Sequence, residues 1–186
     1  EQTRLFTAFS IGTGMRETGG GGRGDLEASI GVDLGSTRID QYDSELFSRV
    51  VGREEADDRT ITLRLEGDHT AGEHGDIRAA VTYADVAHDE VLTPGGTNAF
   101  RQRLWSFAVE SEWKLGASGG TRLSLGTVVD GSDTPLSGDK PPLGRLSDYG
   151  VRVGMSSLAS EGFLLHGAIS RRSRFPSLRE VYSGAL

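Results

Sequence analysis

The fold of this chain is decided by the nine residues Leu26-Glu27-Ala28-Ser29-Ile30-Gly31-Val32-Asp33-Leu34. Every even-numbered residue in this stretch is apolar, and every odd-numbered residue is polar or glycine. Successive side chains of a β-strand point to opposite faces of the sheet, so the alternation predicts a strand with one apolar and one polar face.

The same period of two recurs along the whole chain. The residues that mark the further strand-like segments lie within 4–14, 60–66, 77–83, 105–115, 123–129, 149–155 and 163–169. The eight expected strands reach roughly ten residues or more, whereas strands of soluble proteins are most often about 5–6 residues long. None of the segments carries the apolar stripe with a period of about 3.6 residues that a helix requires. The fold class predicted is therefore all-β, antiparallel and up-and-down.

The composition favours a barrel with a wet interior over a compact soluble domain. Only 35% of the 186 residues are hydrophobic, while glycine is abundant, at 27 residues. Soluble domains usually contain roughly 45–50% apolar residues when glycine is included. A membrane barrel needs an apolar surface only on its outward face, which accounts for the low value.

Charge and cysteine content exclude several classes of function. The formal net charge of -7 makes nucleic acid an improbable partner, because phosphate backbones repel an acidic protein. The absence of cysteine excludes a disulfide framework and any thiolate metal site. No run of about 18 apolar residues predicts a transmembrane helix.

The expected connections alternate in length. Short or glycine-rich turns are predicted at 19–24, 71–75, 116–120 and 159–162, and longer polar loops at 43–58, 88–99 and 130–146. Outer-membrane barrels have short periplasmic turns and extended extracellular loops, so this alternation is typical of them.

Two tryptophans suit the aromatic girdles of such a barrel. Trp105 and Trp113 fall on the same face of one expected strand. Eight residues of strand cover about 26 Å, which a tilt of roughly 40° reduces to about 20 Å along the membrane normal. A chance pair of tryptophans on a buried face is the alternative interpretation.

The last segment carries a specific motif. Residues 174–182 read Arg-Phe-Pro-Ser-Leu-Arg-Glu-Val-Tyr. They resemble the Arg-x-Pro-[Ser/Thr]-Leu-x-Glu-hydrophobic-Tyr sequence of TonB-dependent outer-membrane receptors, and Val181 replaces the commoner leucine. The residues that match are Arg174, Pro176, Ser177, Leu178, Glu180 and Tyr182. The resemblance is good from about Leu104 to Tyr182, and before His88 it is only architectural.

The resemblance implies a location, a function and partners. Such receptors are barrels of about 22 strands in the bacterial outer membrane, so the chain is expected to be a fragment of the barrel wall. A signal peptide, the plug domain and the C-terminal strands are expected to lie outside residues 1–186. The family imports a scarce nutrient, most often a ferric siderophore, with energy from the TonB system. The implied partners are outer-membrane lipid, the TonB system, the plug and a siderophore-like ligand.

The motif also implies roles for its residues. Pro176 cannot donate to a strand ladder and is expected to mark the place where pairing of the last strand stops. Arg174 and Glu180 are expected to join polar networks at the rim or lumen of the barrel. The charged residues expected to face the lumen are Arg64, Glu66, Arg78, Glu110, Glu112, Lys114, Arg122, Arg152 and Arg172.

The other chemical groups give weak signals. His69 and His74 flank a turn without a thiolate partner, and His166 is expected in the lumen. The acidic stretch 54–58 is interpreted as a solvated loop, with a Ca²⁺ or cationic-ligand site as the alternative. No nucleophile, acid–base pair, metal site or cofactor motif stands out, so an enzyme is not expected.

Two other classes of protein remain as alternatives. One is a passive small outer-membrane barrel resembling a porin. The other is a soluble β-sandwich binding module, whose apolar face would lie inside. A cooperative melt of a monomeric, detergent-free chain would favour the sandwich.

Overall fold

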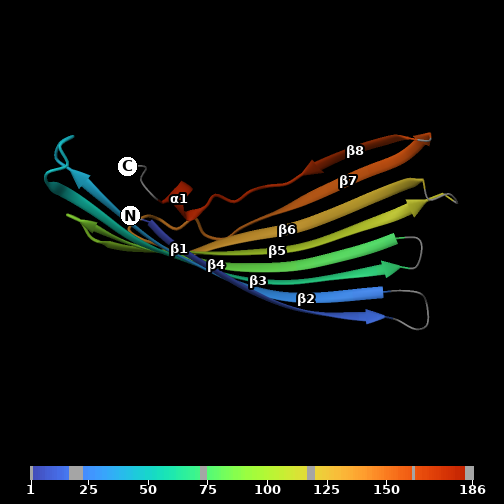
Figure 1. Cartoon of the computed structure of the whole chain (residues 1–186), viewed down its shortest axis with the longest axis horizontal. Coiled ribbons are helices and arrows are strands. Elements are labelled where there is room, and N and C mark those ends of the chain that lie inside the picture. The colour runs from blue at the N-terminus through green and yellow to red at the C-terminus, as the bar shows by residue number, and fades with distance from the viewer. Residues whose placement is uncertain (1, 17–22, 72–74, 117–119, 161, 183–186) are drawn as a thin grey trace.

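The computed structural model describes residues 2–16, 23–71, 75–116, 120–160 and 162–182. The strands are β1 (Gln2–Arg16), β2 (Arg23–Tyr42), β3 (Val50–Ala71), β4 (Gly75–Thr93), β5 (Thr97–Leu115), β6 (Thr121–Ser137), β7 (Leu146–Ser160) and β8 (Phe163–Arg171). They form one antiparallel sheet in which each strand pairs with the next along the chain (Figure 1). The predicted all-β, up-and-down order of eight strands is confirmed, and the sheet is open, since β1 and β8 are its two edges.

The only helix in the described residues is α1 (Leu178–Val181), which follows β8. Among the described residues, no helix is long and apolar enough to cross a membrane.

The strands extend much further than the apolar alternation. β2 and β3 contain 20 and 22 residues, which corresponds to roughly 65–75 Å of chain. The predicted long loops are therefore wrong in extent, because the connections at that end cover only 43–49, 94–96 and 138–145. Backbone groups there still pair with a neighbouring strand. The side chains buried there include polar ones such as Gln102, Ser132 and Thr134, so no apolar alternation marks these strands in the sequence.

Cross-strand register keeps the alternation in phase over the sheet. Ile30 pairs with Leu63, Leu63 with Tyr83, and Tyr83 with Trp105, so all four share one face. We call this the outer face, and the opposite face, which carries Phe100, the inner face. The apolar residues of the outer face form an apolar band, whose main members are Phe9, Ile11, Leu26, Ile30, Leu63, Leu65, Ile77, Val81, Phe107, Val109, Leu125, Val129, Val151, Val153, Met155 and Ile169.

Few apolar side chains are buried. Within the described residues the buried hydrophobic side chains are Ala56, Phe100, Leu178 and Tyr182. Members of the apolar band are exposed instead, with Phe9 at 64% and Met155 at 56% of their full accessible surface. The only hydrophobic core of the described chain is thus a small cluster on the inner face, formed by Phe100, Leu178 and Tyr182 with Val86 and Val181 against them.

Each tryptophan lies over a glycine of the neighbouring strand. Trp105 pairs with Gly131, and Trp113 pairs with Gly75. A Cβ atom at Gly131 would be 2.1 Å from the Trp105 ring, and one at Gly75 would be 2.9 Å from the Trp113 ring. Because glycine has no side chain, each indole rests against the sheet. Both tryptophans lie on the outer face, as their spacing predicts.

We expect Gly131→Ala to displace the indole of Trp105 and to reduce the free energy of unfolding by about 1–3 kcal/mol, because an added carbon overpacks this contact. The matched control is Gly126→Ala on the inner face of the same strand, where the added Cβ would have no neighbour closer than 3.7 Å. Near-UV circular dichroism and denaturant unfolding measure both effects. Identical spectra for the two variants would contradict the described contact.

Candidate functional site

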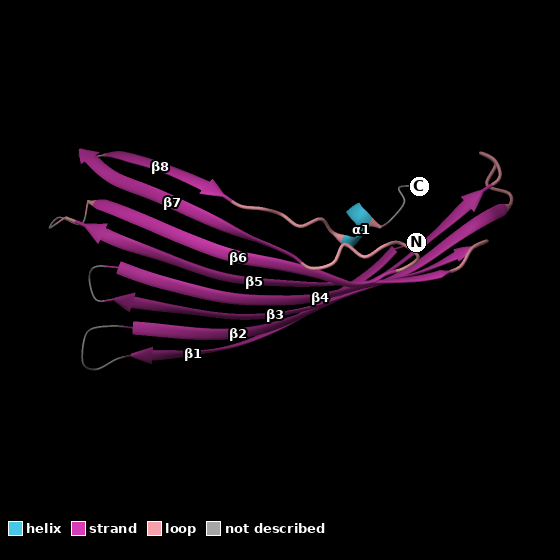
Figure 2. Cartoon of the chain, turned by 180° about the vertical axis from the view of Figure 1, so that it is seen from behind, coloured by secondary structure: helices cyan, strands magenta, loops and turns pink. Residues whose placement is uncertain are grey.

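The chain after β8 leaves the sheet and crosses its inner face. Both views show this segment passing over the sheet to α1 (Figures 1 and 2). Residues 174–182, which contain the motif identified in the sequence, are called the C-terminal clamp below. Strand pairing ends at Arg171, so the prediction that Pro176 marks this point is wrong by five residues. The chain turns inward before it reaches the proline.

The polar motif residues build the short helix. The Ser177 side chain accepts a hydrogen bond from the Glu180 backbone N–H, and the Glu180 carboxylate accepts one from the Ser177 N–H, at 2.7 Å. This reciprocal arrangement is a capping box, which satisfies N–H groups that a helix start leaves unpaired. Arg174 donates a hydrogen bond to the same carboxylate. The expected network of Arg174 and Glu180 is thus a pair within the clamp.

The apolar motif residues insert into the inner-face cluster. Leu178 and Tyr182 are 6% and 4% exposed. The Tyr182 ring stacks on Phe100 with 5.8 Å between ring centroids, and His88 packs on Phe100 at 5.9 Å. Burial of these side chains is the apolar contribution that holds the clamp on β5.

Polar contacts fix the clamp at three further points. The Gln102 amide donates to the Pro176 carbonyl oxygen at 2.9 Å and to the Ser132 hydroxyl at 3.1 Å. The Tyr182 hydroxyl accepts from the Leu143 backbone N–H at 2.9 Å, and the Lys140 ammonium donates to the Tyr182 carbonyl oxygen. The clamp therefore ties β5 to the connection 138–145, and Gln102 in turn bonds to Ser132 on β6.

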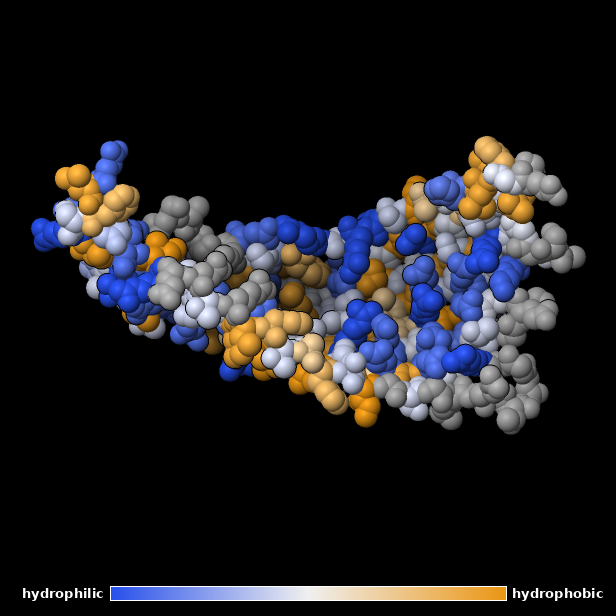
Figure 3. Space-filling view, in the orientation of Figure 1, coloured by the Kyte–Doolittle hydropathy of each residue, from blue (hydrophilic) through white to orange (hydrophobic). Residues whose placement is uncertain are grey.

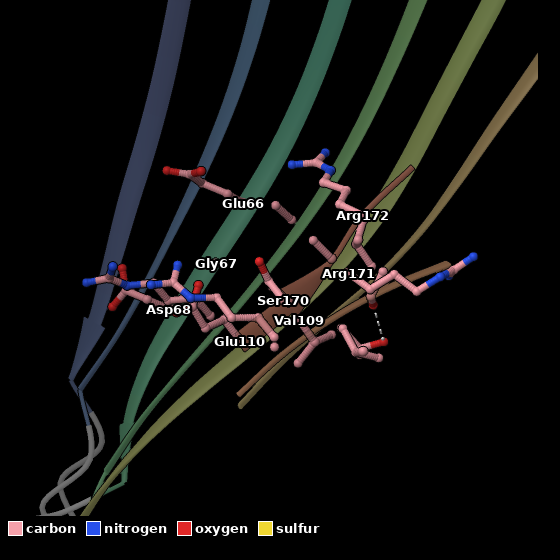
Figure 4. Close-up of a pocket in the computed structure, with 18 of the residues that line it drawn as sticks. Glu66, Gly67, Asp68, Val109, Glu110, Ser170, Arg171 and Arg172 are labelled. Carbon is pink, nitrogen blue, oxygen red and sulfur yellow. Dashed lines mark hydrogen bonds between the residues drawn. The ribbon is translucent and has the colours of Figure 1, made fainter. Parts of the chain in front are cut away.

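A hollow of about 780 Å³ lies on the inner face beside the clamp, towards the end of the sheet that carries the short turns. Its floor is made of small residues on four neighbouring strands, namely Ala80, Ala108, Gly126 and Gly150. In the close-up Glu66 and Arg172 lie near each other, whereas the Arg171 side chain points away from the other labelled residues (Figure 4). The hollow exists because the residues of its floor have small side chains, and charged residues border it.

The charges around the hollow alternate in sign from strand to strand. Asp68 pairs with Arg78, Arg78 with Glu110, and Gly126 with Arg152 in one cross-strand row. Arg78, Glu110 and Arg152 form no ion pair with another described residue, so their charges are open to a polar occupant. In the space-filling view hydrophilic residues predominate over this half of the sheet (Figure 3).

Register places the predicted lumen charges on one face. The eight that lie in strands are on the inner face, and Arg172 borders the hollow. Two pairs among them are ion pairs, Arg64 with Glu66 and Arg122 with Glu112. His166 pairs with Ser156 and shares this face.

The acidic stretch 54–58 is not the loop expected from the sequence. It lies inside β3, so Glu54 and Asp58 face inward while Glu55 and Asp57 face outward. His74 lies outside the described residues, as do most residues of the predicted short turns. Within the described part of the chain, no three histidine, aspartate or glutamate side chains gather closely enough to hold a metal ion.

The sequence did not predict the contacts that receive the clamp. Phe100, Gln102 and His88 lie in strand ends without apolar alternation, and His88 is bound to Asp58 with 2.7 Å between Nδ1 and Oδ1. The helix itself had a signal, since Ser177 followed by Glu180 is the spacing of a capping box. What the inner face offers chemically is a polar, charge-lined recess that can bind a solute by charge-assisted hydrogen bonds.

We expect Leu178→Ala to release the clamp, because truncation of a buried leucine costs about 2–5 kcal/mol of packing free energy. Hydrogen–deuterium exchange over residues 175–182 should accelerate. The control is Leu136→Ala, since Leu136 is 49% exposed and pairs with Arg101 on the outer face. Unchanged exchange in the Leu178 variant would show that the clamp is not held by this side chain.

The clamp should also weaken in acid. The Ser177 backbone N–H, followed by the Arg174 guanidinium, holds the pKa of Glu180 below its ordinary value. A lowered pKa means that the carboxylate stabilises the clamp above the ordinary glutamate range and that this contribution is lost as the pH falls through the lowered pKa. A carbon-detected NMR titration of the carboxyl group measures it. Arg174→Gln should raise the pKa of Glu180, and Arg172→Gln should leave it in place.

Comparison with known proteins adds no assignment to this geometry. No protein-family model matches the chain, and no curated protein sequence matches it.

Proposed function

We propose that this chain is a segment of an outer-membrane β-barrel wall, from a transporter of the TonB-dependent-receptor type that imports a scarce nutrient. The nutrient class is a ferric siderophore or a similar small ligand. In this proposal the chain performs no covalent chemistry and holds no cofactor, and its partners are lipid, the plug domain and the TonB energising system.

The observation that carries the proposal is the continuous apolar band on the outer face. Its side chains are exposed over all eight strands, while the opposite face is charged. Monomeric soluble proteins rarely expose a contiguous apolar surface of more than a few hundred Å². Lipid is an occupant that suits a broad apolar belt on a strand meander, since β2 to β7 pair with a neighbouring strand on both sides.

Aromatic side chains at the borders of the band add support. Tyr83, Trp105 and Tyr149 lie on the outer face towards the connections 94–96 and 138–145, and Trp113 and Phe163 lie towards the short turns. Outer-membrane barrels carry such girdles at both membrane interfaces.

The exposed apolar band and the long strands give little support to the alternative of a soluble β-sandwich. A sandwich buries the apolar face of one sheet against a second sheet. The described residues form a single sheet, and its buried apolar cluster lies on the charged inner face. Seven of the eight strands contain 15–22 residues, whereas strands of soluble sheets are most often about 5–6 residues long.

The transport proposal rests on the motif of the C-terminal clamp and on the charged hollow. Its test is the coding sequence that flanks this segment in the source genome. A plug-like domain upstream and further alternating strands to a terminal aromatic residue are expected. Uptake of radiolabelled ferric siderophores by iron-starved cells, with and without the gene, then tests the function. Stop codons close to both ends would instead favour a passive small barrel and overturn the transport proposal.

We expect Val109→Arg to impair membrane assembly by about 2–4 kcal/mol, because Val109 lies in the apolar band and an arginine near the bilayer midplane is costly. Val128→Arg is the matched control, since Val128 borders the hollow on the inner face, where charge is tolerated. A vesicle-folding assay compares the two variants. Equal insertion of both would refute the assignment of the lipid-facing side.

A further inference from the structure

The hollow on the inner face has the form of a trench across the strands. Its floor is one row of cross-strand partners, formed by Ala80, Ala108, Val128 and Gly150. The next row on the side of the short turns lies two residues further along each strand, about 6.7 Å away, and it is the charged row from Asp68 to Arg152. An occupant of the trench therefore contacts a floor of small side chains and a charged wall at the same time.

Most charges that border the hollow are already neutralised. The ion pairs are Arg64 with Glu66, Arg171 with Asp148, and Arg172 with Asp130. In the charged row, Arg78 lies between Asp68 and Glu110, and Asp76 is its neighbour along the same face of β4. One guanidinium cannot neutralise three carboxylates, so Glu110 keeps a negative charge that no described residue balances.

Arg152 is the opposite case, because it has no acidic neighbour on its face. Its cross-strand partners are Gly126 and Ser170, and the residues before and after it on the same face of β7 are Gly150 and Gly154. Arg152 forms no ion pair within the described chain. Its guanidinium is therefore an unbalanced cation among small, uncharged residues.

A glycine separates these two charges. Gly126 pairs with Glu110 on one side and with Arg152 on the other, so the charged residues are two strands apart, about 9.5 Å at the backbone. A Cβ atom on Gly126 would lie 3.8 Å from Glu110 Cγ and 3.7 Å from Arg152 Cβ. The space above Gly126 is thus flanked by a carboxylate and a guanidinium, and it belongs to the hollow.

Opposite charges at this spacing match the two charged groups of an α-amino acid. A guanidinium binds a carboxylate with paired hydrogen bonds, and a carboxylate accepts hydrogen bonds from an ammonium group. An amino acid over Gly126 can direct its carboxylate to Arg152 and its ammonium group to Glu110. Its side chain then has the adjoining floor row, with Ala108 and Val128, as an apolar surface.

A second hollow continues the floor towards the C-terminal clamp. It has a volume of about 570 Å³ and is bordered by residues 172–175 of the chain that leaves β8. Ala84, Leu104 and Phe175 contribute apolar surface to it, and Arg172 borders both hollows. A large apolar side chain on the floor therefore points towards further apolar surface.

We propose that the inner face binds a zwitterionic α-amino acid with a large apolar side chain, with its carboxylate on Arg152 and its ammonium group on Glu110. The side chain lies on Ala108 and Val128 and points towards Phe175. This solute differs in class from a ferric siderophore, so the inference goes beyond the proposed function and does not rest on it.

L-Phenylalanine and two analogues that each lack one charge provide the test. Hydrocinnamate lacks the ammonium group, and phenethylamine lacks the carboxylate. In the full chain, folded in detergent micelles with isotope-labelled glycine, L-phenylalanine should shift the amide NMR signals of Gly126 and Gly150 saturably. The signal of Gly31 on β2, which does not line the hollow, should stay in place. Each analogue should bind roughly tenfold more weakly, because it lacks one set of charge-assisted hydrogen bonds.

Single-charge variants assign each group. Glu110→Gln should weaken binding of L-phenylalanine and phenethylamine and leave hydrocinnamate unchanged, whereas Arg152→Gln should weaken L-phenylalanine and hydrocinnamate and leave phenethylamine unchanged. Arg122→Gln is the matched control, since Arg122 is an inner-face arginine that does not line the hollow. Gly126→Leu retains both charges but fills the space between them, and it should abolish binding of L-phenylalanine. An unchanged Gly31 signal identifies the variants that fold.

The opposing outcomes are distinct. Equal affinity for L-phenylalanine and hydrocinnamate would show a site for anions alone and overturn the proposed zwitterion. Absence of saturable shifts at Gly126 and Gly150 would overturn the site itself. Either result leaves the membrane location intact, because the vesicle-folding assay of Val109→Arg tests that location on the opposite face.

Discussion

The structure depends on backbone hydrogen bonding between consecutive strands in a fixed register. A shift of one residue between any two strands would move every side chain of one strand to the other face. The pairing of Ile30, Leu63, Tyr83 and Trp105 keeps the apolar residues of four strands together, and the row from Asp68 to Arg152 does the same for charges on the other side. With so few buried apolar side chains, this ladder and the environment of the outer face determine the fold.

The inner face has a different organisation at each end. At the end with the short turns, small residues on β4 to β7 leave a charge-bordered hollow. At the other end the C-terminal clamp fills the corresponding space with Leu178 and Tyr182, which pack on Phe100. The same face therefore provides an open polar recess and a closed apolar cluster along the same strands.

The sequence predicted the features that follow local periodicity. Alternation identified all eight strands, the face of Trp105 and Trp113, and the side on which charges such as Arg78 and Glu110 lie. It could not predict how far β3 and β6 extend, because the inward-facing residues at these strand ends are largely polar, such as Asp58 on β3 and Ser132 on β6, and leave no apolar alternation. The docking of Tyr182 on Phe100 joins residues 82 positions apart, so no local pattern contains it. The helix of the clamp was accessible from Ser177 and Glu180 through their spacing alone.

The clamp spans several strands of a curved sheet. The chain leaves β8, yet α1 rests on β5, and its Gln102 and Leu143 contacts fix that position. Geometrically the segment is a chord across an arc of four strands (Figure 2). For four strands of fixed spacing, the distance between the two points that the segment connects determines how strongly the sheet curves. The length of this short peptide therefore determines the local curvature of the sheet. Flattening the sheet at this point would require this segment to lengthen and Leu178 and Tyr182 to leave their contacts.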